Sequence, residues 1–323
     1  MQNLTERDKH YLARLTDFLL REYGFAVISI KPAKRGYYGE TWRLDTVSGS
    51  YFIKIVFSKA HKVFYERSFP VVDRINSAHI DCVSKIIKTL DGRLYTDFND
   101  GIVGVFDWID GENVQDEHTK ISEYNILAHI YTIPFDGLNI PRENFRTQSA
   151  VLFYQQWDML GALKQSETAN KLLKLFKKHA TDFERLFFRL RWFSERCKKD
   201  KTHFYITHGD AGGNVIVNAE KSYIVDWDDP VIAPPEWDAW FCLHWDWAMS
   251  GFDSALCKNE IDYFLRPERL AYYCYHSFFW YMTKYMETFF ENGGTSSELA
   301  DEIENYLENS WILENIKYAD TIE

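Results

Sequence analysis

The sequence predicts an α+β protein with two lobes, an N-terminal lobe built on an antiparallel sheet and a mostly helical C-terminal lobe. Three observations predict it. The chain has 323 residues, of which 46% are hydrophobic. This length and apolar content exceed what the core of one typical domain needs. Short β-rich runs separated by turn residues dominate the first third. Beyond Gly111 the apolar residues recur mainly at helical spacing.

The N-terminal lobe is expected to open with an amphipathic helix over residues 3–22, because Leu12, Leu15 and Leu19 recur at helical spacing and Gly24 follows as a C-cap. The next β-rich runs are separated by turn signals and predict an antiparallel meander over residues 25–30, 41–45 and 51–57. The remaining elements expected in this lobe are a helix over residues 63–76 and strands at 83–90 and 101–108.

In the C-terminal part, apolar stripes predict packed helices over residues 271–286 and 299–316. Three short β-rich pieces interrupt this helical half, at residues 204–207, 215–217 and 223–225. The change of pattern near residues 106–112 places the lobe boundary, which gives lobes of residues 1–107 and 108–323. Loops at strand ends often carry function, so the three β-rich pieces are the first place to look for chemistry.

Composition excludes several classes of partner. The formal net charge of −11 and the pI near 5.4 oppose binding to the phosphates of nucleic acids or membranes. The five cysteines are scattered without a C-x-x-C pair, which is typical of free thiols in a reducing compartment. Charges interrupt the N-terminal segment, and the most aromatic stretch is too short and too polar to span a bilayer. We therefore expect a cytoplasmic protein with no nucleic-acid or membrane partner.

The polar residues around the last two β-rich pieces fit phosphoryl transfer. Asp210 and Asn214 precede the strand at residues 215–217, and Asp226 ends the strand at residues 223–225. Phosphoryl transfer needs a carboxylate to orient or deprotonate the attacking hydroxyl, and hard oxygen ligands to hold Mg²⁺ against the phosphates. We expect Asp210 to be the base, and Asn214 and Asp226 to converge on the metal from opposite ends of a hairpin.

Two segments of this region resemble the signatures of the aminoglycoside phosphotransferase family and its choline-kinase-like relatives. They are Thr-His-Gly-Asp with the following Asn, residues 207–214, and Ile-Val-Asp-Trp-Asp-Asp-Pro through Glu-Trp-Asp, residues 224–238. The second segment is similar to the spectinomycin phosphotransferase branch in particular. The resemblance implies a bilobal protein-kinase-like fold, ATP and Mg²⁺ as cofactors, and a supporting hydrogen-bonding role for His208. The family loop has four residues between the catalytic Asp and the Asn, whereas this chain has three.

The resemblance also implies a nucleotide-binding N-terminal lobe and a catalytic, substrate-binding C-terminal lobe. Lys54, inside an apolar strand, resembles the lysine that pairs with the donor phosphates. Glu66 stands where that lysine's ion-pair partner is expected, although a solvated helix face explains it equally well. Residues 35–41 are read as a hairpin over the phosphates, with a plain β-turn as the alternative. No G-x-x-x-x-G-K-[ST] motif occurs, which excludes a P-loop.

The acceptor is expected to be a small cationic molecule with a hydroxyl group. Acidic residues alternate with tryptophans after Asp226, and such a set suits an aminated sugar or cyclitol, although core packing is the simpler explanation for each tryptophan. The members are Asp228, Asp229, Glu236, Trp237, Asp238, Trp240, Trp245, Asp246, Trp247 and Asp253.

The sequence therefore predicts ATP-dependent phosphorylation of an aminoglycoside or aminocyclitol antibiotic. A role in antibiotic resistance is a separate inference, because fold and chemistry do not fix the physiological substrate. Two alternatives stay open. One is a metabolic kinase for choline, homoserine or a sugar on the same fold. The other is a nucleotide-binding scaffold without catalysis, which the shortened loop suggests.

Overall fold

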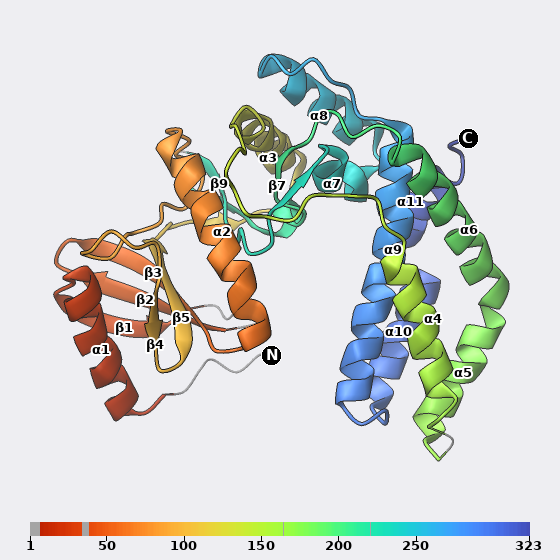
Figure 1. Ribbon diagram of the computed structural model, residues 1–323, viewed down its shortest axis with the longest axis horizontal. Helices are drawn as coiled ribbons and strands as arrows, with labels where there is room; N and C mark the ends of the chain where they lie inside the picture. The colour runs from red at the N-terminus through yellow and green to blue at the C-terminus, as the bar shows by residue number, and fades with distance from the viewer. Residues whose placement is uncertain (1–6, 34–38, 164, 220) are drawn as a thin grey trace. The chain divides into compact units, whose positions relative to one another are not determined.

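The protein is represented by a computed structural model that describes residues 7–33, 39–163, 165–219 and 221–323 (Figure 1). The chain forms two compact units. The first consists of Met1–Arg142 and Tyr205–Ile232, and the second of Glu143–Phe204 and Ala233–Glu323. An antiparallel sheet in the N-terminal part and a mostly helical C-terminal part confirm the predicted α+β class. The functional division into lobes of residues 1–107 and 108–323 stays a prediction.

The elements of the first unit alternate between helices and short strands. Its helices are α1 (Lys9–Tyr23), α2 (Lys59–Ser77), α3 (Glu117–Ile130) and the 3₁₀ turn η1 (Ala211–Gly213). Its strands are β1 (Val27–Pro32), β2 (Glu40–Thr46), β3 (Gly49–Val56), β4 (Thr96–Phe98), β5 (Gly101–Asp107), β6 (Glu112–Asn113), β7 (Tyr205–Thr207), β8 (Val215–Val217) and β9 (Ser222–Ile224), with β10 (Val231–Ala233) leading into the second unit.

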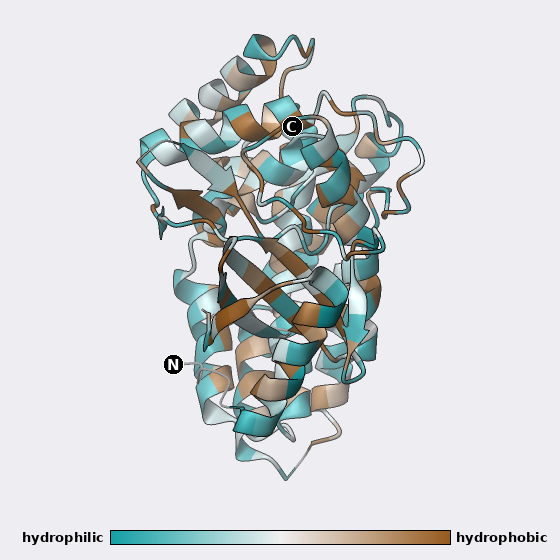
Figure 2. Cartoon of the chain, turned by 90° about the vertical axis from the view of Figure 1, so that its left-hand side faces the viewer, coloured by the Kyte–Doolittle hydropathy of each residue, from teal (hydrophilic) through white to brown (hydrophobic). Residues whose placement is uncertain are grey.

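The main sheet of the first unit has the strand order β1-β2-β3-β5-β4, and its pairs are antiparallel. This confirms the predicted meander. The strand predicted at residues 83–90 is wrong, because this segment makes only isolated bridges: Ile86 pairs with Phe106, while β4 occupies the other half of the β5 edge. Figure 2 shows hydrophobic residues along the sheet strands, as expected for a sheet covered by helices.

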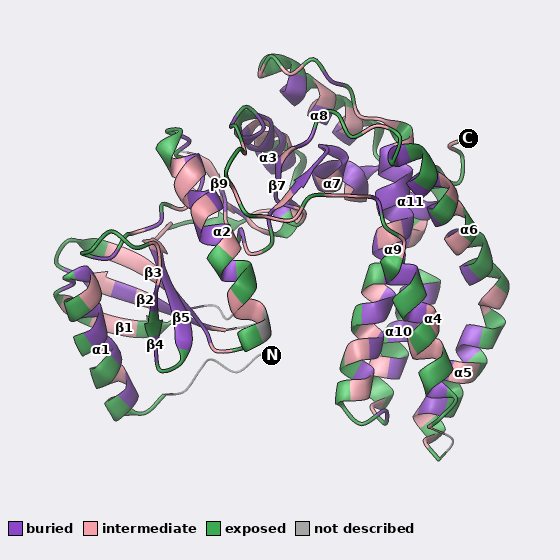
Figure 3. Ribbon diagram, in the orientation of Figure 1, coloured by how far each residue is buried: buried purple, intermediate pink, exposed green. Residues whose placement is uncertain are grey.

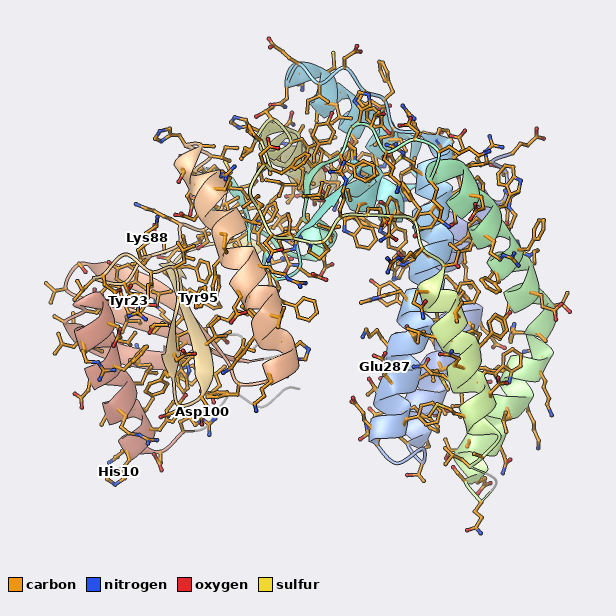
Figure 4. The ribbon with its side chains drawn as sticks, viewed as in Figure 1. His10, Tyr23, Lys88, Tyr95, Asp100 and Glu287 are labelled. Carbon is orange, nitrogen blue, oxygen red and sulfur yellow. The ribbon has the colours of Figure 1, made fainter. Side chains whose placement is uncertain are left out.

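The face of the sheet that bears α1 forms a large apolar core. Asp8 caps the start of α1 by accepting from the Tyr11 backbone N–H at 2.7 Å, and Gly24 ends it with a φ of +74°, which favours glycine. Leu15 and Leu19 are fully buried against strand residues of this face. Tyr23, labelled in Figure 4, stacks on Phe25. The predicted helix and its cap are confirmed for the described residues, and residues 3–6 of the predicted range lie outside them.

The opposite face of the sheet carries α2. Ile53 and Ile55 belong to the α1 core, so strand alternation turns Lys54 between them toward α2. Gly104 lies beside Lys54 on β5, and a Cβ added there would come within 2.6 Å of the Phe69 ring of α2. The glycine therefore allows α2 to approach the sheet. Figure 3 shows β5 buried along most of its length.

A second, three-stranded sheet in the first unit has the order β6-β8-β9. β8 and β9 form the predicted hairpin, in which Val215 pairs with Ile224 and Val217 with Ser222. α3 contacts both strands. The backbone N–H of Ile224 also donates to the Cys82 carbonyl at 2.9 Å, which joins the hairpin to the segment after α2.

The second unit is helical. Its helices are α4 (Gln148–Leu160), α5 (Glu167–Lys178), α6 (Ala180–Cys197), α7 (Glu236–Ala239), η2 (Trp240–Cys242), α8 (Asp246–Lys258), α9 (Pro267–Glu291), α10 (Ser297–Asn309) and α11 (Ile312–Ala319). The long helix α9 contacts α4, α6, α7, α10 and α11, and most of its residues are buried. The single helix predicted over residues 299–316 is two helices, because Ser310 takes an extended ψ of 152°. Within the described ranges, no helix combines the length and apolarity that a bilayer span requires.

Candidate active site

Lys54 lies at the centre of a cluster of charges in the first unit. Its Nζ atom is 2.6 Å from Asp226 Oδ1, and 2.8 and 2.6 Å from the two carboxylate oxygens of Asp228. The lysine side chain is only 8% exposed. A buried ammonium group needs such partners, since an uncompensated charge away from water is costly.

The charges of this cluster stabilise one another. Burial alone would lower the pKa of Lys54, but the carboxylates of Asp228 and Asp226 outweigh it and raise the net pKa. Burial pushes the pKa of Asp226 upward, yet the Lys54 ammonium lowers it overall. Burial raises the pKa of Asp228 despite the same lysine. Lys54 is therefore firmly cationic, and Asp226 is the more readily ionised of the two carboxylates.

Tyr65 of α2, rather than Glu66, faces Lys54. The Tyr65 hydroxyl donates to Asp228 Oδ2 at 2.6 Å, and the Lys54 Nζ atom lies 4.9 Å from the centre of the tyrosine ring. Neighbouring residues of a helix point about 100° apart, so Glu66 cannot share this direction and is exposed. Among the described residues, the ion pairs of Lys54 go to Asp226 and Asp228, and the expected pair with Glu66 is not formed.

Asp210 and Asn214 flank the 3₁₀ turn before β8. The side-chain N–H of Asn214 donates to the Asp210 carbonyl at 2.7 Å and lies 3.4 Å from its carboxylate. The Asn214 carbonyl accepts from the Val225 N–H at 2.9 Å, which sets the loop beside the residue that precedes Asp226. Gly209, with a φ of +81°, supplies the backbone turn into the loop. The three-residue spacing thus closes as a single 3₁₀ turn.

His208 ties the two halves of this region together. Its Nδ1 atom accepts from the Asp210 backbone N–H at 3.2 Å, so the proton resides on Nε2, which donates to the Val225 carbonyl at 2.9 Å. The ring also packs edge-on against buried Trp227, at 4.6 Å between ring centres. His208 accordingly holds the loop and the end of β9 in register.

The environment of Asp210 suits a proton acceptor. Although part of its surface is exposed, the surrounding loop partly buries the carboxylate, which raises its pKa, and the charge of Asp226 adds to the shift. A raised carboxyl pKa makes the ionised form a stronger base. Asp226 itself takes a φ of +66°, a left-handed conformation that is uncommon outside glycine and concentrates at functional sites.

The oxygen donors at this site fit a magnesium ion. The amide nitrogen of Asn214 is used as a donor, so its Oδ1 atom is the group suited to a cation, and Asp226 offers a carboxylate. Among the residues that the structure describes, no group of three or more His, Cys, Asp or Glu side chains forms a complete metal cage. Mg²⁺ commonly binds one or two carboxylates and completes its shell with water and substrate phosphates.

The acidic residues expected at the acceptor divide into different environments. Asp228 pairs with Lys54, as described above. Glu236 is fully buried in the second unit, where Oε1 accepts from the Tyr263 hydroxyl at 2.6 Å and from the Arg266 backbone N–H at 2.7 Å. Asp238 is also buried, and Asp253 accepts from the Leu265 backbone N–H at 2.9 Å. The hydrogen bonds of Glu236 and Asp253 help to hold the fold of the second unit.

Trp245, Asp246 and Trp247 form an accessible group at the start of α8, and we call them the α8 group. The two indole rings are nearly parallel, 5.8 Å apart between centres, and Trp245 is 43% exposed. Asp246 is exposed in the first turn of the helix. Trp240, by contrast, is buried, which agrees with the core explanation for that residue.

Sequence reasoning proposed Lys54, Asp210, Asn214 and Asp226 as site residues, which stays a prediction, and did not consider Tyr65. The structure brings the four together with Asp228 in the first unit and leaves Glu66 outside their contacts. The D-x-D spacing of Asp226 and Asp228 was a usable sign for the second carboxylate. In the hairpin expected over the phosphates, residues 35–38 lie outside the described residues.

Comparison with solved structures supports the fold. Spectinomycin phosphotransferase in complex with ADP and spectinomycin matches with a TM-score of 0.76 and 17% identity, over 96% of this chain and 98% of that one. An amicoumacin kinase in complex with AMP-PNP and Ca²⁺ matches with a TM-score of 0.61 and 13% identity, over 98% of this chain and 96% of that one. Choline kinase from Cryptosporidium parvum Iowa II matches with a TM-score of 0.57 and 13% identity, over 91% of this chain and 89% of that one.

Comparison with curated protein sequences gives no match. The family model described as the phosphotransferase enzyme family matches residues 29–273, which is more than half of the chain and includes both the Lys54 strand and the β8–β9 hairpin. The chain therefore belongs to the phosphotransferase enzyme family.

Proposed function

We propose that this protein transfers the γ-phosphoryl group of ATP to a hydroxyl group of a small aminated molecule, an aminoglycoside or aminocyclitol. The observation that carries the proposal is the contact of Lys54 with Asp226, beside the loop that holds Asp210 and Asn214. The family supports the reaction type, and the ADP and AMP-PNP bound in structural neighbours support the donor.

In the proposed reaction, the Asp210 carboxylate accepts a hydrogen bond from the acceptor hydroxyl and takes its proton as the oxygen attacks the γ-phosphorus. The new O–P bond forms while the bond to the leaving ADP oxygen breaks, and ADP departs with that electron pair. Lys54 is cationic and offsets the charge of the donor phosphates. Positioning and charge stabilisation supply most of the rate.

Asn214 and Asp226 are the residues that would hold Mg²⁺. The ion would supply charge neutralisation at the phosphate oxygens when it is bound. Lys54 keeps the Asp226 carboxylate ionised, which favours this role. His208 maintains the spacing between the loop and Asp226 through its hydrogen bonds with Asp210 and Val225.

The α8 group supports a cationic acceptor. A pair of parallel indoles next to a carboxylate offers ring faces for stacking and a charge for an ammonium group. The structural likeness to spectinomycin phosphotransferase agrees with this acceptor class. Choline kinase, also among the structural neighbours, motivates the second candidate, a metabolic kinase for a small amino alcohol.

The test is a substrate panel. Purified protein with ATP and Mg²⁺ is incubated with spectinomycin, other aminoglycosides, choline and homoserine, and ADP release is followed with an Asp210→Asn variant as the background. Acceptor-dependent ADP release with an aminocyclitol or aminoglycoside is expected. A response to choline or homoserine alone would favour the metabolic kinase. Binding of ATP without turnover on any acceptor would favour a scaffold.

A further inference from the structure

The partner of the strand lysine in this chain comes from an unexpected place. Lys54 was expected to pair with a glutamate of α2, but its contacts are with two carboxylates that follow β9. α2 contributes the Tyr65 hydroxyl instead. The two carboxylates differ in how they are held, and that difference separates their roles.

Asp228 is the more firmly held of the two. Both of its oxygens lie within 2.8 Å of Lys54 Nζ, and Oδ2 also accepts the Tyr65 hydroxyl at 2.6 Å. Asp226 contributes only Oδ1 to the lysine, so one lysine contact holds it against the two that hold Asp228. The Asp226 side chain is 43% exposed and that of Asp228 31%.

The charges of the cluster favour different roles for Asp226 and Asp228. One ammonium faces two carboxylates, so the cluster has an excess of negative charge that a bound cation at Asp226 would balance. An ammonium group has three N–H donors, so Lys54 can keep Asp228 as a partner and still direct a donor to a phosphate oxygen. Tyr65 is buried and packs its ring against the lysine, which limits movement of both side chains.

We propose that Asp228, fixed by the Tyr65 hydroxyl, is the residue that positions Lys54 for the donor phosphates, in the role that the sequence suggested for Glu66. This inference rests on the proposed function for its phosphate partner. Asp226 is then released for the metal. Asp228 and Tyr65 act through Lys54 and are positioning residues.

The first measurement needs no nucleotide. Acetylation of Lys54 by an amine-reactive N-hydroxysuccinimide ester is followed by mass spectrometry in the wild type and in Asp228→Asn and Tyr65→Phe variants. Loss of the partner removes the charge-assisted contacts that hold the Lys54 ammonium and frees the amine, so the Asp228→Asn variant should label about tenfold faster. Tyr65→Phe keeps the ring and should label at an intermediate rate.

The matched control is Asp73→Asn. Asp73 lies on α2 as Tyr65 does, and it pairs with a different lysine, Lys88, at 2.9 Å (Lys88 is labelled in Figure 4). This variant also removes one carboxylate from a lysine pair, but it should label Lys54 at the wild-type rate. The proposal is overturned if Glu66→Gln, rather than Asp228→Asn, releases Lys54.

The second measurement is the affinity for AMP-PNP with Mg²⁺, by calorimetry. Asp228→Asn removes a charge-assisted contact that positions Lys54. The dissociation constant for AMP-PNP should therefore rise by about tenfold to a hundredfold. Faster labelling with unchanged affinity would mean that the pair is only structural, which contradicts the proposal. A wild type that binds no nucleotide would refute the proposed function, while the labelling rates would still decide which residue holds Lys54.

If the Asp228→Asn variant does not fold, the Tyr65→Phe variant tests the positioning of Lys54 instead. Removing one hydroxyl keeps the ring contacts, so circular dichroism should match the wild type. The Tyr65→Phe variant should show faster Lys54 labelling and weaker AMP-PNP binding than the wild type. Wild-type values for both would overturn the role of Tyr65.

Discussion

At the scale of single residues, the Asp210 carboxylate carries the proton transfer of the proposed reaction. Replacing it with Asn keeps the shape and the loop but removes the base. Acceptor-dependent turnover should fall by about 10²- to 10⁴-fold, as for loss of a general base. AMP-PNP binding should persist, because Lys54 and Asp226 are unchanged. Steady-state ADP release and calorimetry measure the two effects, and undiminished turnover would disprove the assignment.

The same carboxylate predicts a pH dependence. Asp210 acts only when ionised, and its pKa is raised by partial burial and by Asp226. On acidification, kcat/KM should therefore fall at a pH above the ordinary carboxyl pKa of about 3.9. A profile of kcat/KM against pH gives the apparent value. A rate that stays flat down to the ordinary carboxyl pKa would contradict the raised pKa of the base.

His276 predicts a pH dependence of stability rather than of activity. Burial lowers its pKa to about 4 from the ordinary 6.5, so the folded state binds fewer protons than the unfolded chain between these values. Stability contributed by neutral His276 is present above pH 6.5 and lost as the pH falls toward 4, by up to about 1.4 kcal/mol per pH unit. Between pH 7 and pH 5, urea unfolding should show a smaller loss of the free energy of unfolding for His276→Leu than for the wild type.

At the scale of elements, the approach of α2 to the sheet depends on Gly104. A methyl group there would lie 2.6 Å from Phe69 Cζ, and Phe69 is buried between Tyr65 and Phe106. Gly104→Ala should lower the free energy of unfolding by about 1–3 kcal/mol, the usual cost of overpacking. Urea denaturation measures it. Phe69→Leu in the same chain should recover part of the loss, and strict additivity of the two changes would argue against a clash.

Element-level prediction from the sequence succeeded where the pattern was local. The meander, α1 with its Gly24 cap, and the β8–β9 hairpin each follow from residues that are adjacent in the chain. The break at Ser310 was missed because the apolar spacing runs on through it. The strand expected over residues 83–90 does not form, because the available β5 edge accepts only a short contact.

The candidate site shows the same limit. Asp210, Asn214 and Asp226 lie on one hairpin, so their proximity was readable from the sequence. The contact of Tyr65 with Asp228 joins positions 163 residues apart, and it depends on how far α2 is rotated against the sheet. Adjacent Tyr65 and Glu66 are both compatible with a helix. Phe69, one turn after Tyr65, packs close to Gly104, which agrees with Tyr65 rather than Glu66 facing the sheet.

At the scale of the whole molecule, the residues of the proposed chemistry belong to one of the two compact units. Lys54, Asp210 and Asp226 lie in the first unit, and the α8 group lies in the second. The second unit has its own core, in which α9 contacts most of the other helices. Changes in the α8 group should therefore leave nucleotide binding unaltered.

Asp246→Asn tests this separation. Loss of an exposed carboxylate beside two indoles should raise KM for an aminated acceptor by about three- to tenfold, while kcat changes little. The dissociation constant for AMP-PNP should equal the wild-type value, since the nucleotide contacts proposed here involve the first unit alone.

The matched control is Asp182→Asn, because Asp182 is also exposed in the first turn of a helix, α6. Both variants lose the same favourable interaction with a helix N-terminus, so a difference between them reports acceptor recognition rather than helix stability. Steady-state kinetics with varied acceptor distinguishes the outcomes. An equal KM in the two variants would exclude a role of the α8 group in acceptor binding. A weaker AMP-PNP affinity in Asp246→Asn would contradict nucleotide binding by the first unit alone.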